Sequence, residues 1–231
     1  MDMKLFLEEK YDEITGEKKK IFDEFYDLLI EYNKKYNLTA ITEEKDVFYK
    51  HFLDSAAGEF LFPKSANVLE IGSGAGFPSL VLKILRPDLT FTLCESIGKK
   101  CAFLNAAKEK LNLDGIKIVN ARAEDISKLP EYREKFDVSC ARAVAAMNTL
   151  SEYCLPFVKK GGKFIAYKGS DEQEIKTAEN AVKILGGKIK NVYAYDLPEG
   201  YGKRTLIETE KVRYTPPRYP RGNGKAHKNP L

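Results

Sequence analysis

The most constraining feature of this chain is an alternation of short apolar runs with longer helical segments, which begins after Pro63. Such alternation is typical of β-α-β units, whose strands run parallel within one sheet. The runs expected as parallel strands are residues 67–71, 89–95, 115–120, 136–141 and 161–167. Two later runs, 187–195 and 203–210, flank a turn with Pro198, Gly200 and Gly202 and predict an antiparallel pair that closes the sheet edge. We therefore expect an α/β fold with a mostly parallel seven-stranded sheet and an antiparallel edge strand.

The residues on either side of this region predict a helical extension and a tail. From Lys18 to Tyr36 apolar side chains recur at three- and four-residue steps, the period of an amphipathic helix. A second helix is expected from about Glu43 to Phe60, with Thr42 as its N-cap. From residue 215 onwards the chain is too rich in proline, glycine and charge for regular structure. We expect an N-terminal helical extension packed on the catalytic domain (1–62), an α/β domain (63–212) and a basic C-terminal tail (213–231).

Composition excludes several classes of protein. Of the 231 residues, 43% are hydrophobic and 31% are charged, which argues against a disordered or fibrous chain. No apolar run approaches the roughly 18 residues of a membrane helix, and the first ten residues lack the pattern of a signal peptide. The four cysteines have no zinc-site spacing, so we expect reduced thiols in a cytoplasmic protein without a metal centre.

Charge is distributed unevenly along the chain. Residues 1–60 hold 15 acidic and 9 basic residues, a net of −6, although the whole chain carries +4. Residues 211–231 hold six basic residues and no acidic one. An acidic head and a basic tail favour the approach of a polyanion, such as a nucleic acid, to the tail. The alternative is a disordered tail that is only solvated.

A glycine-rich turn follows the first expected strand, in the run VLEIGSGAGFP. Gly72, Gly74 and Gly76 lie where a helix should begin, at the strand end where doubly wound folds bind their ligands. A dinucleotide loop would place its third glycine at position 77, which is Phe77, and no Walker lysine is present. The turn therefore indicates a ligand loop of another kind, unless the glycines only permit a tight turn.

Two acidic residues define the ligand expected there. Glu70 lies two residues before the turn, where an anion favours a positively charged ligand over a pyrophosphate. Glu95 ends the second strand, 23 residues after Gly72, close to the spacing of about 20 residues at which an acid reaches ribose hydroxyls. S-adenosylmethionine carries a sulfonium, an amine and a ribose diol but no phosphate. It is therefore the predicted cofactor, and Ser96, next to Glu95, is included in its site.

The end of the third strand is expected to lie beside the adenine of that cofactor. A main-chain amide at Ala123 or Glu124 could recognise the base without a special side chain. The alternative is that Glu124 and Asp125 are helix N-terminal acids that stabilise the helix dipole.

The end of the fourth strand, FDVSCARA, limits which atom could receive a methyl group. It lacks the Asn/Asp-Pro-Pro-Tyr/Phe loop that holds an exocyclic amine, and Cys140 lies in an apolar strand as a buried small hydrophobe would. Guanine N7 carries no proton and requires only positioning. Arg142 is the residue predicted to position it, the catalytic candidate, unless it forms a surface salt bridge. Lys168 and Arg204 are lesser candidates for RNA contacts.

Six segments of the chain resemble the ribosomal small-subunit methyltransferase G family, also called glucose-inhibited division protein B. They are NLTAITE (37–43), HFLDS (51–55), VLEIGSGAGFP (68–78), FDVSCARAV (136–144), AYKG (166–169) and YPRGNGKAHKNPL (219–231). The similarity covers nearly the whole chain in the family's order. It implies a class I Rossmann-like methyltransferase that transfers methyl from S-adenosylmethionine to N7 of one guanine in bacterial 16S rRNA, near the decoding region.

The resemblance also assigns residues and partners. By position it implies cofactor contacts at Gly72, Phe77, Glu95, Ala123, Glu124 and Arg142. His51 and Asp54 match the family's His-x-x-Asp-Ser helix, but His51 alone is interpreted as a packing residue. The implied partner is 16S rRNA or the small ribosomal subunit, for a monomeric protein that needs neither metal nor membrane.

One departure from the family lies in the tail. Gly224 is followed by Lys225 and Ala226, where the family commonly has Gly-Thr-Pro. The cofactor site is unaffected, whereas the way in which the tail would contact RNA is left open. Two other functions also stay open: a basic RNA-binding module with this fold but no cofactor, and a small-molecule methyltransferase.

Overall fold

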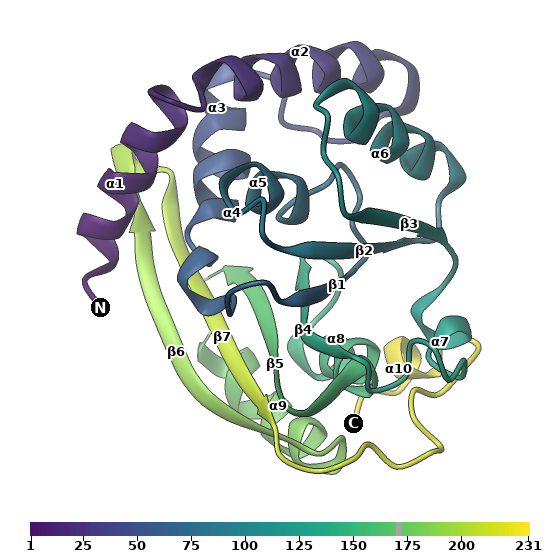
Figure 1. Ribbon diagram of the computed structural model, residues 1–231. Helices are drawn as coiled ribbons and strands as arrows, with labels where there is room; N and C mark the ends of the chain where they lie inside the picture. Colours follow the sequence, from purple (N-terminus) through teal and green to yellow (C-terminus); the bar gives the residue numbers. More distant parts are fainter. Residues whose placement is uncertain (170–171) are drawn as a thin grey trace.

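The computed structural model describes residues 1–169 and 172–231. A seven-stranded sheet with the strand order β3-β2-β1-β4-β5-β7-β6 lies at its centre (Figure 1). The strands are β1 (Asn67–Ile71), β2 (Thr90–Glu95), β3 (Ile116–Asn120), β4 (Phe136–Arg142), β5 (Val158–Gly169), β6 (Gly187–Leu197) and β7 (Gly202–Lys211). Neighbouring strands from β3 to β5 are parallel, whereas β7 is antiparallel to both β5 and β6. The expected sheet is confirmed, with β6 at the edge and β7 between β6 and β5.

Helices cover both faces of this sheet (Figure 1). Three of them pack on one face, namely α2 (Lys19–Tyr36), α5 (Ser79–Leu85) and α6 (Gly98–Lys110). Three others lie on the opposite face, namely α7 (Ala123–Ile126), α8 (Met147–Cys154) and α9 (Glu172–Ile184). Neighbouring strand residues alternate between the two cores, so that Val68 belongs to the first and Leu69 to the second. Burial on both faces explains why the strands appear in the sequence as continuous apolar runs.

The N-terminal extension begins with two helices that pack against the first core. Helix α1 spans Met3–Thr15, and the Asp2 carboxylate caps it by accepting a hydrogen bond from the Lys4 N–H at 2.9 Å. Helix α2 confirms the segment expected from residue 18 to 36. Its apolar stripe, which includes Phe22, Phe25 and Leu29, is buried.

The helical stretch expected over residues 43–60 is confirmed from Glu44 to Ala56, but it is not one regular α-helix. The segment divides into α3 (Glu44–Val47), a π-helical segment (Phe48–Leu53), α4 (Asp54–Ala56) and a 3₁₀ turn (Glu59–Leu61). Thr42 is not the N-cap, because Glu43 occupies that position and makes no side-chain capping bond. The wider π turn coincides with a tertiary contact, since the Lys50 carbonyl accepts a hydrogen bond from Arg142 of β4 at 3.0 Å. Such bulges are frequent at functional sites.

The strand order changes direction between β1 and β4, which are neighbours in the sheet. At such a switch point the chain leaves two adjacent strands toward opposite faces, and a crevice opens beyond their carboxyl ends. The glycine turn after β1, the end of β2 and the end of β4 therefore border the same crevice.

The C-terminal tail is docked on the protein and is not purely solvated. Thr215, Tyr219 and Ala226 are buried, and the Thr149 hydroxyl of α8 donates to the Ala226 carbonyl at 3.1 Å. The expectation of no regular structure after residue 215 needs one correction, a single helical turn, α10 (Lys225–Lys228). This turn forms where Ala226 is buried against α8.

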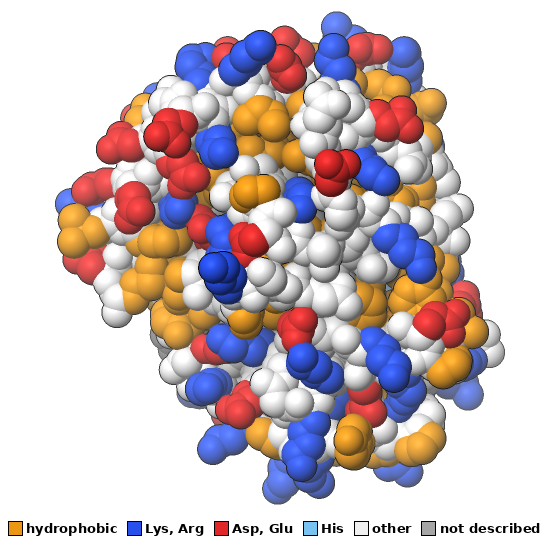
Figure 2. All heavy atoms as spheres, viewed as in Figure 1, with side chains coloured by type: hydrophobic (Ala, Val, Ile, Leu, Met, Phe, Trp, Pro, Cys, Tyr) orange, Lys and Arg blue, Asp and Glu red, His pale blue; other side chains and the backbone are white. Residues whose placement is uncertain are grey.

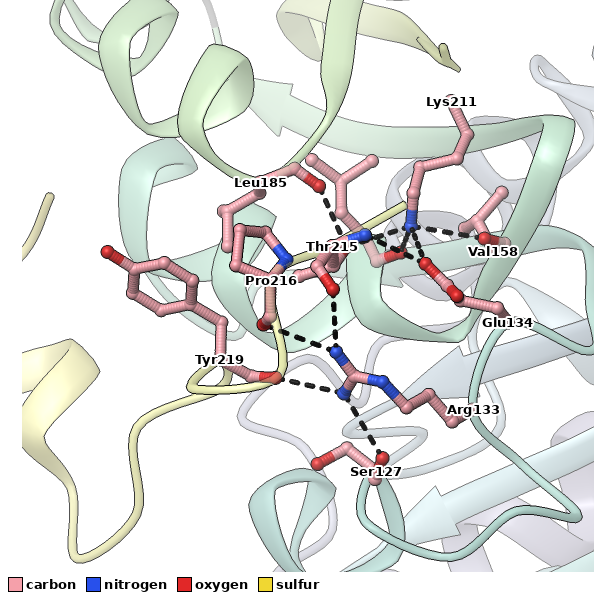
Figure 3. Close-up of polar contacts among 10 residues, drawn as sticks. Ser127, Arg133, Glu134, Val158, Leu185, Lys211, Thr215, Pro216 and Tyr219 are labelled. Carbon is pink, nitrogen blue, oxygen red and sulfur yellow. Dashed lines mark hydrogen bonds and ion pairs between the residues drawn. The ribbon is translucent and has the colours of Figure 1, made fainter. Parts of the chain in front are cut away.

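Two basic side chains anchor the start of the tail (Figure 3). The Arg133 guanidinium donates to four main-chain carbonyls, those of Ser127, Thr215, Pro216 and Tyr219. The fully buried Lys211 ammonium lies 3.1 Å from a Glu134 carboxylate oxygen and donates to the Thr215 hydroxyl at 2.8 Å. Burial lowers the pKa of Lys211 to about 8, although Glu134 opposes this shift.

A third anchor lies further along the tail and gives a prediction about stability. Arg221 donates through Nε and Nη2 to both oxygens of the buried Glu152 carboxylate, with the Nη2–Oε2 distance at 2.6 Å. We expect Arg221→Ala to destabilise the protein by about 3 kcal/mol, because it leaves a buried carboxylate without its cation. Urea denaturation at pH 7 measures this, and Lys228→Ala on the exposed side of α10 is the control, with a change below about 0.5 kcal/mol.

A double variant separates the charge effect from lost packing. Adding Glu152→Gln to Arg221→Ala removes the unpaired charge, so the double variant should be more stable than Arg221→Ala alone. A double variant that is less stable than the single one would contradict this account.

Candidate functional site

Three glycines shape the turn between β1 and α5. Gly72, Gly74 and Gly76 all have positive φ angles, of 70°, 54° and 83°. A Cβ atom on Gly72 would lie 2.7 Å from Cγ2 of Val144, and one on Gly76 would clash with the Leu80 side chain. Backbone conformation favours glycine at all three positions, and space also requires it at Gly72 and Gly76.

Glu95 joins this turn to the loop after β2. Its side chain is buried, and its Oε2 accepts a hydrogen bond from the Gly74 N–H at 2.9 Å. Its Oε1 accepts one from the Ile97 N–H at 2.8 Å. Each carboxylate oxygen has further acceptor capacity, so Glu95 could also accept hydrogen bonds from a diol. The structure thus brings together Glu95 and the glycine turn that the sequence placed 21 residues away.

A cleft of about 130 Å³ opens at the carboxyl ends of β1 to β4. Its lining residues are Ile71, Gly72, Cys94, Ser96, Ala121, Arg122, Ala123, Glu124, Val144 and Tyr153. Four predicted residues, Gly72, Ser96, Ala123 and Glu124, are thus brought together. Its lining combines apolar side chains with the polar groups of Ser96, Arg122 and Glu124.

Sequence reasoning missed Val144 and Tyr153, which line the cleft from the chain after β4. No motif marks either residue, because the path of the chain after β4 sets their positions. Val144 touches the cleft floor at Gly72. The only local signal is that Val144 follows Arg142 at a strand end, where such folds carry functional loops.

Glu70 does not line the cleft. Its side chain is fully buried, and neither carboxylate oxygen has a hydrogen-bond partner among the described residues. Burial raises the pKa of Glu70 to about 7, against the smaller opposing effects of the Ser79 hydroxyl and the Arg142 charge. Glu70 is thus not the anion beside the ligand that its place before the turn predicts, because its side chain is buried.

Phe77 is likewise directed away from the cleft. Its ring stacks on the His51 imidazole, with 4.4 Å between ring centroids, and packs near Phe25 and Phe52 of the N-terminal extension. The Arg142 guanidinium lies 5.1 Å from its centroid. Only the main chain of Phe77 remains near the turn to contact a ligand, because its side chain is buried in the aromatic core.

Arg142 lies in a buried polar cluster and not in a surface salt bridge. Its Nη1 is 3.0 Å from Oδ2 of Asp54, and its Nη2 is 3.1 Å from Nδ1 of His51. Only 12% of the Arg142 side chain is exposed. His51 is expected only as a packing residue and Asp54 is given no role by the sequence, although their His-x-x-Asp spacing puts both on one side of a helical segment.

The remaining candidates are engaged in contacts inside the protein. Lys168 pairs with Glu174 at 2.6 Å and donates to the Ala145 carbonyl, so its charge is already neutralised. Arg204 Nε lies 3.6 Å from Oδ1 of Asp54. Cys140 is fully buried, and burial raises its pKa well above the ordinary value, so it lacks the thiolate that a nucleophile requires.

Within residues 1–169 and 172–231, no three His, Cys, Asp or Glu side chains are grouped to hold a metal ion. None of the helices in these ranges has the length and apolarity that a membrane crossing requires.

Solved structures share the fold at low sequence identity. A mutant of MtNAS in complex with S-adenosylmethionine matches with a TM-score of 0.57 and 19% identity, over 84% of this chain and 73% of that one. M. jannaschii TYW2 in complex with AdoMet matches with a TM-score of 0.56 and 13% identity, over 69% of this chain and 75% of that one. These likenesses confirm the class I methyltransferase fold.

Relatives of closer sequence carry one shared name. A family model described as rRNA small subunit methyltransferase G matches residues 18–201. The protein named Ribosomal RNA small subunit methyltransferase G from Brevibacillus brevis is 46% identical over 221 residues, which cover 94% of this chain and 93% of the relative. The protein of the same name from Lactobacillus johnsonii is 45% identical and is matched over the full length of both chains. This chain therefore belongs to the rRNA small subunit methyltransferase G family.

Proposed function

We propose that this protein transfers a methyl group from S-adenosylmethionine to N7 of a guanine in bacterial 16S rRNA, in the cytoplasm. The observation that carries the proposal is the Glu95 carboxylate, held between the Gly74 and Ile97 amides at the crevice of a methyltransferase fold. The substrate class comes from the name of the relatives, and the choice of guanine N7 comes from the sequence resemblance.

The residues of the crevice fit this cofactor. The Glu95 carboxylate would accept hydrogen bonds from the ribose hydroxyls. The main chain at Gly72, Gly74 and Gly76, which has no side chains, would let the cofactor approach closely. Ser96, Ala123 and Glu124 line the cleft on the side where the base would lie. When bound, S-adenosylmethionine supplies an electrophilic methyl group. The task of the protein is then to align the acceptor atom with that methyl group.

The protonation states in and near the site agree with such a task. Guanine N7 presents a lone pair without a proton, so no general base has to remove one. His51 is buried beside Arg142, and these two effects lower its pKa to about 3, which makes it a poor base at neutral pH. Cys140 is protonated and inaccessible. Positioning by Arg142 is the contribution that we assign to the end of β4.

RNA would approach over the docked tail. Arg218, Lys225 and Lys228 are exposed there, and none has an ion-pair partner in the part of the chain that the structure describes. The acidic side chains gather instead over α1, at the left of Figure 2, while Lys and Arg are frequent in the lower part of the same view. Repulsion between phosphate and the acidic helices would favour the tail side.

Methylation of the proposed atom is tested directly. Purified protein is incubated with S-adenosylmethionine and either 16S rRNA or small subunits, and the nucleosides are then analysed by mass spectrometry. We expect one additional 7-methylguanosine per 16S molecule. Methylation at another atom of guanine would contradict the N7 assignment, and no methylation of either substrate would contradict the proposed function.

Glu95→Gln should weaken cofactor binding by about 1.5 to 3 kcal/mol, because charge-assisted hydrogen bonds to the ribose are lost. An amide also offers a single oxygen, so either the Gly74 or the Ile97 amide loses its acceptor. Calorimetric titration with S-adenosylmethionine measures the change, and Glu109→Gln on the exposed side of α6 is the matched control. Unchanged affinity in Glu95→Gln would remove this residue from the site.

Glu70→Gln should remove a pH dependence of stability in the cofactor-free protein. The folded protein keeps a proton on Glu70 up to a pKa of about 7, whereas the unfolded chain releases it near 4.5. The native stability therefore falls as pH rises through this interval, and Gln, which does not titrate, is spared that loss. Relative to Glu70→Gln, the natural protein should lose about 2 to 3 kcal/mol between pH 5 and pH 8 in urea denaturation. If the free energy of unfolding depended on pH in the same way in both proteins, the protonation of Glu70 would not be coupled to folding.

A further inference from the structure

Arg142 keeps two hydrogen-bond donors in reserve. A guanidinium has five N–H donors. Three of them are used inside the protein, on the Lys50 carbonyl at 3.0 Å, on Asp54 Oδ2 at 3.0 Å and on His51 Nδ1 at 3.1 Å. The Nε–H and one Nη2–H have no partner within residues 1–169 and 172–231. The group is therefore held firmly while part of it remains available.

All three partners of Arg142 belong to the π-helical segment and the first residue of α4. Asp54 is itself fixed from the opposite side, because the Tyr195 hydroxyl of β6 donates to its Oδ1 at 2.8 Å. Arg204 of β7 adds a second positive charge near the same oxygen. The carboxylate that orients Arg142 is thus held by strands at the far edge of the sheet, and its side chain is only 8% exposed.

The orientation of His51 is fixed by chemistry as well as by contact. Arginine can only donate, so Nδ1 of His51 must be the acceptor and Nε2 must carry the proton. That Nε2–H donates to the Thr39 hydroxyl oxygen at 3.0 Å, and this oxygen also accepts from the Ile41 N–H at 3.1 Å. The imidazole is further held by stacking on Phe77. Each nitrogen of the His51 ring therefore has one hydrogen-bonding role: Nδ1 accepts and Nε2 donates.

We propose that His51 and Asp54 are positioning residues for methyl transfer, which hold Arg142 so that its two remaining donors meet an oxygen of the substrate RNA. They act through Arg142 and do not touch the reacting atoms. This role rests on the proposed function, because it requires an RNA substrate at the end of β4. Both residues come from the N-terminal extension, so the extension would take part in positioning the substrate. His51 and Asp54 lie 91 and 88 positions before Arg142 in the sequence.

The role is tested by kinetics on 16S rRNA or small subunits. His51→Phe keeps a ring to stack on Phe77 but removes the acceptor, and we expect kcat to fall at least tenfold while the affinity for S-adenosylmethionine changes less than twofold. His51→Gln can accept from Arg142 through Oε1 and donate to Thr39 through Nε2, so it should recover most of the loss. Phe22→Leu, which thins the same core without touching the cluster, controls for reduced stability and should keep kcat within twofold.

A double-mutant cycle asks whether His51 acts through Arg142. In an Arg142→Ala background, His51→Phe should reduce kcat less than twofold further, because the group that it orients is gone. An equal loss in both backgrounds would overturn the proposal. So would a kcat in His51→Phe equal to that of the natural protein.

A spectroscopic measurement needs no methylation assay. Nitrogen-15 spectra of the imidazole should show a neutral ring, protonated at Nε2, down to pH 5, with His227→Gln used to assign the signals of the two histidines. A ring protonated at Nδ1, or a charged ring at pH 6, would overturn the arrangement. An inactive natural protein would overturn the proposed function and this role together, whereas an active one with an equally active His51→Phe variant would overturn this role alone.

Discussion

The ion pair between Arg142 and Asp54 connects the sheet to the N-terminal extension at the point where chemistry is expected. Both side chains are nearly buried, at 12% and 8% exposure. Removing two charges from water costs about as much as their attraction returns, so such a pair adds little net stability. The pair instead fixes the orientation of the Arg142 guanidinium. Together with the Lys50 carbonyl and His51, Asp54 gives this planar group three hydrogen-bond partners. The extension therefore determines how the Arg142 guanidinium is oriented, although it lies outside the sheet.

The cofactor side of the crevice is organised in the same way by Glu95. One carboxylate accepts from the loop after β1 through Gly74 and from the loop after β2 through Ile97. Glu95 therefore ties the two loops to each other, and a bound diol would use the acceptor capacity that remains on this carboxylate. Preorganisation of this kind lowers the entropy that binding must overcome. Glu95 and Asp54 are thus both buried carboxylates that hold main-chain or side-chain donors in place.

The strands and the glycine turn could be predicted because their signals are local. A strand buried on both faces is a continuous apolar run, and a turn with positive φ angles requires glycine at Gly72, Gly74 and Gly76. The π-helical segment could not be predicted, because it is associated with Arg142, which lies 92 residues after Lys50. For the same reason the sequence indicated neither that the Phe77 ring turns into the aromatic core nor that Glu70 lies beneath the turn. The direction in which a side chain points depends on neighbours that the sequence places far away.

The tail shows why a count of charges is a poor guide to an electrostatic surface. Of the six basic residues in 211–231, Lys211 and Arg221 neutralise Glu134 and Glu152, and Arg213 donates to the Lys183 carbonyl. These three contacts anchor the segment, and Arg218, Lys225 and Lys228 remain exposed at positions that the anchors fix. A cation on a docked segment loses less conformational freedom on meeting a phosphate than one on a flexible chain. Three of the six basic residues therefore anchor the segment, and this fixes where the other three are exposed. The positions of the exposed cations, more than the net charge, would determine where an RNA binds.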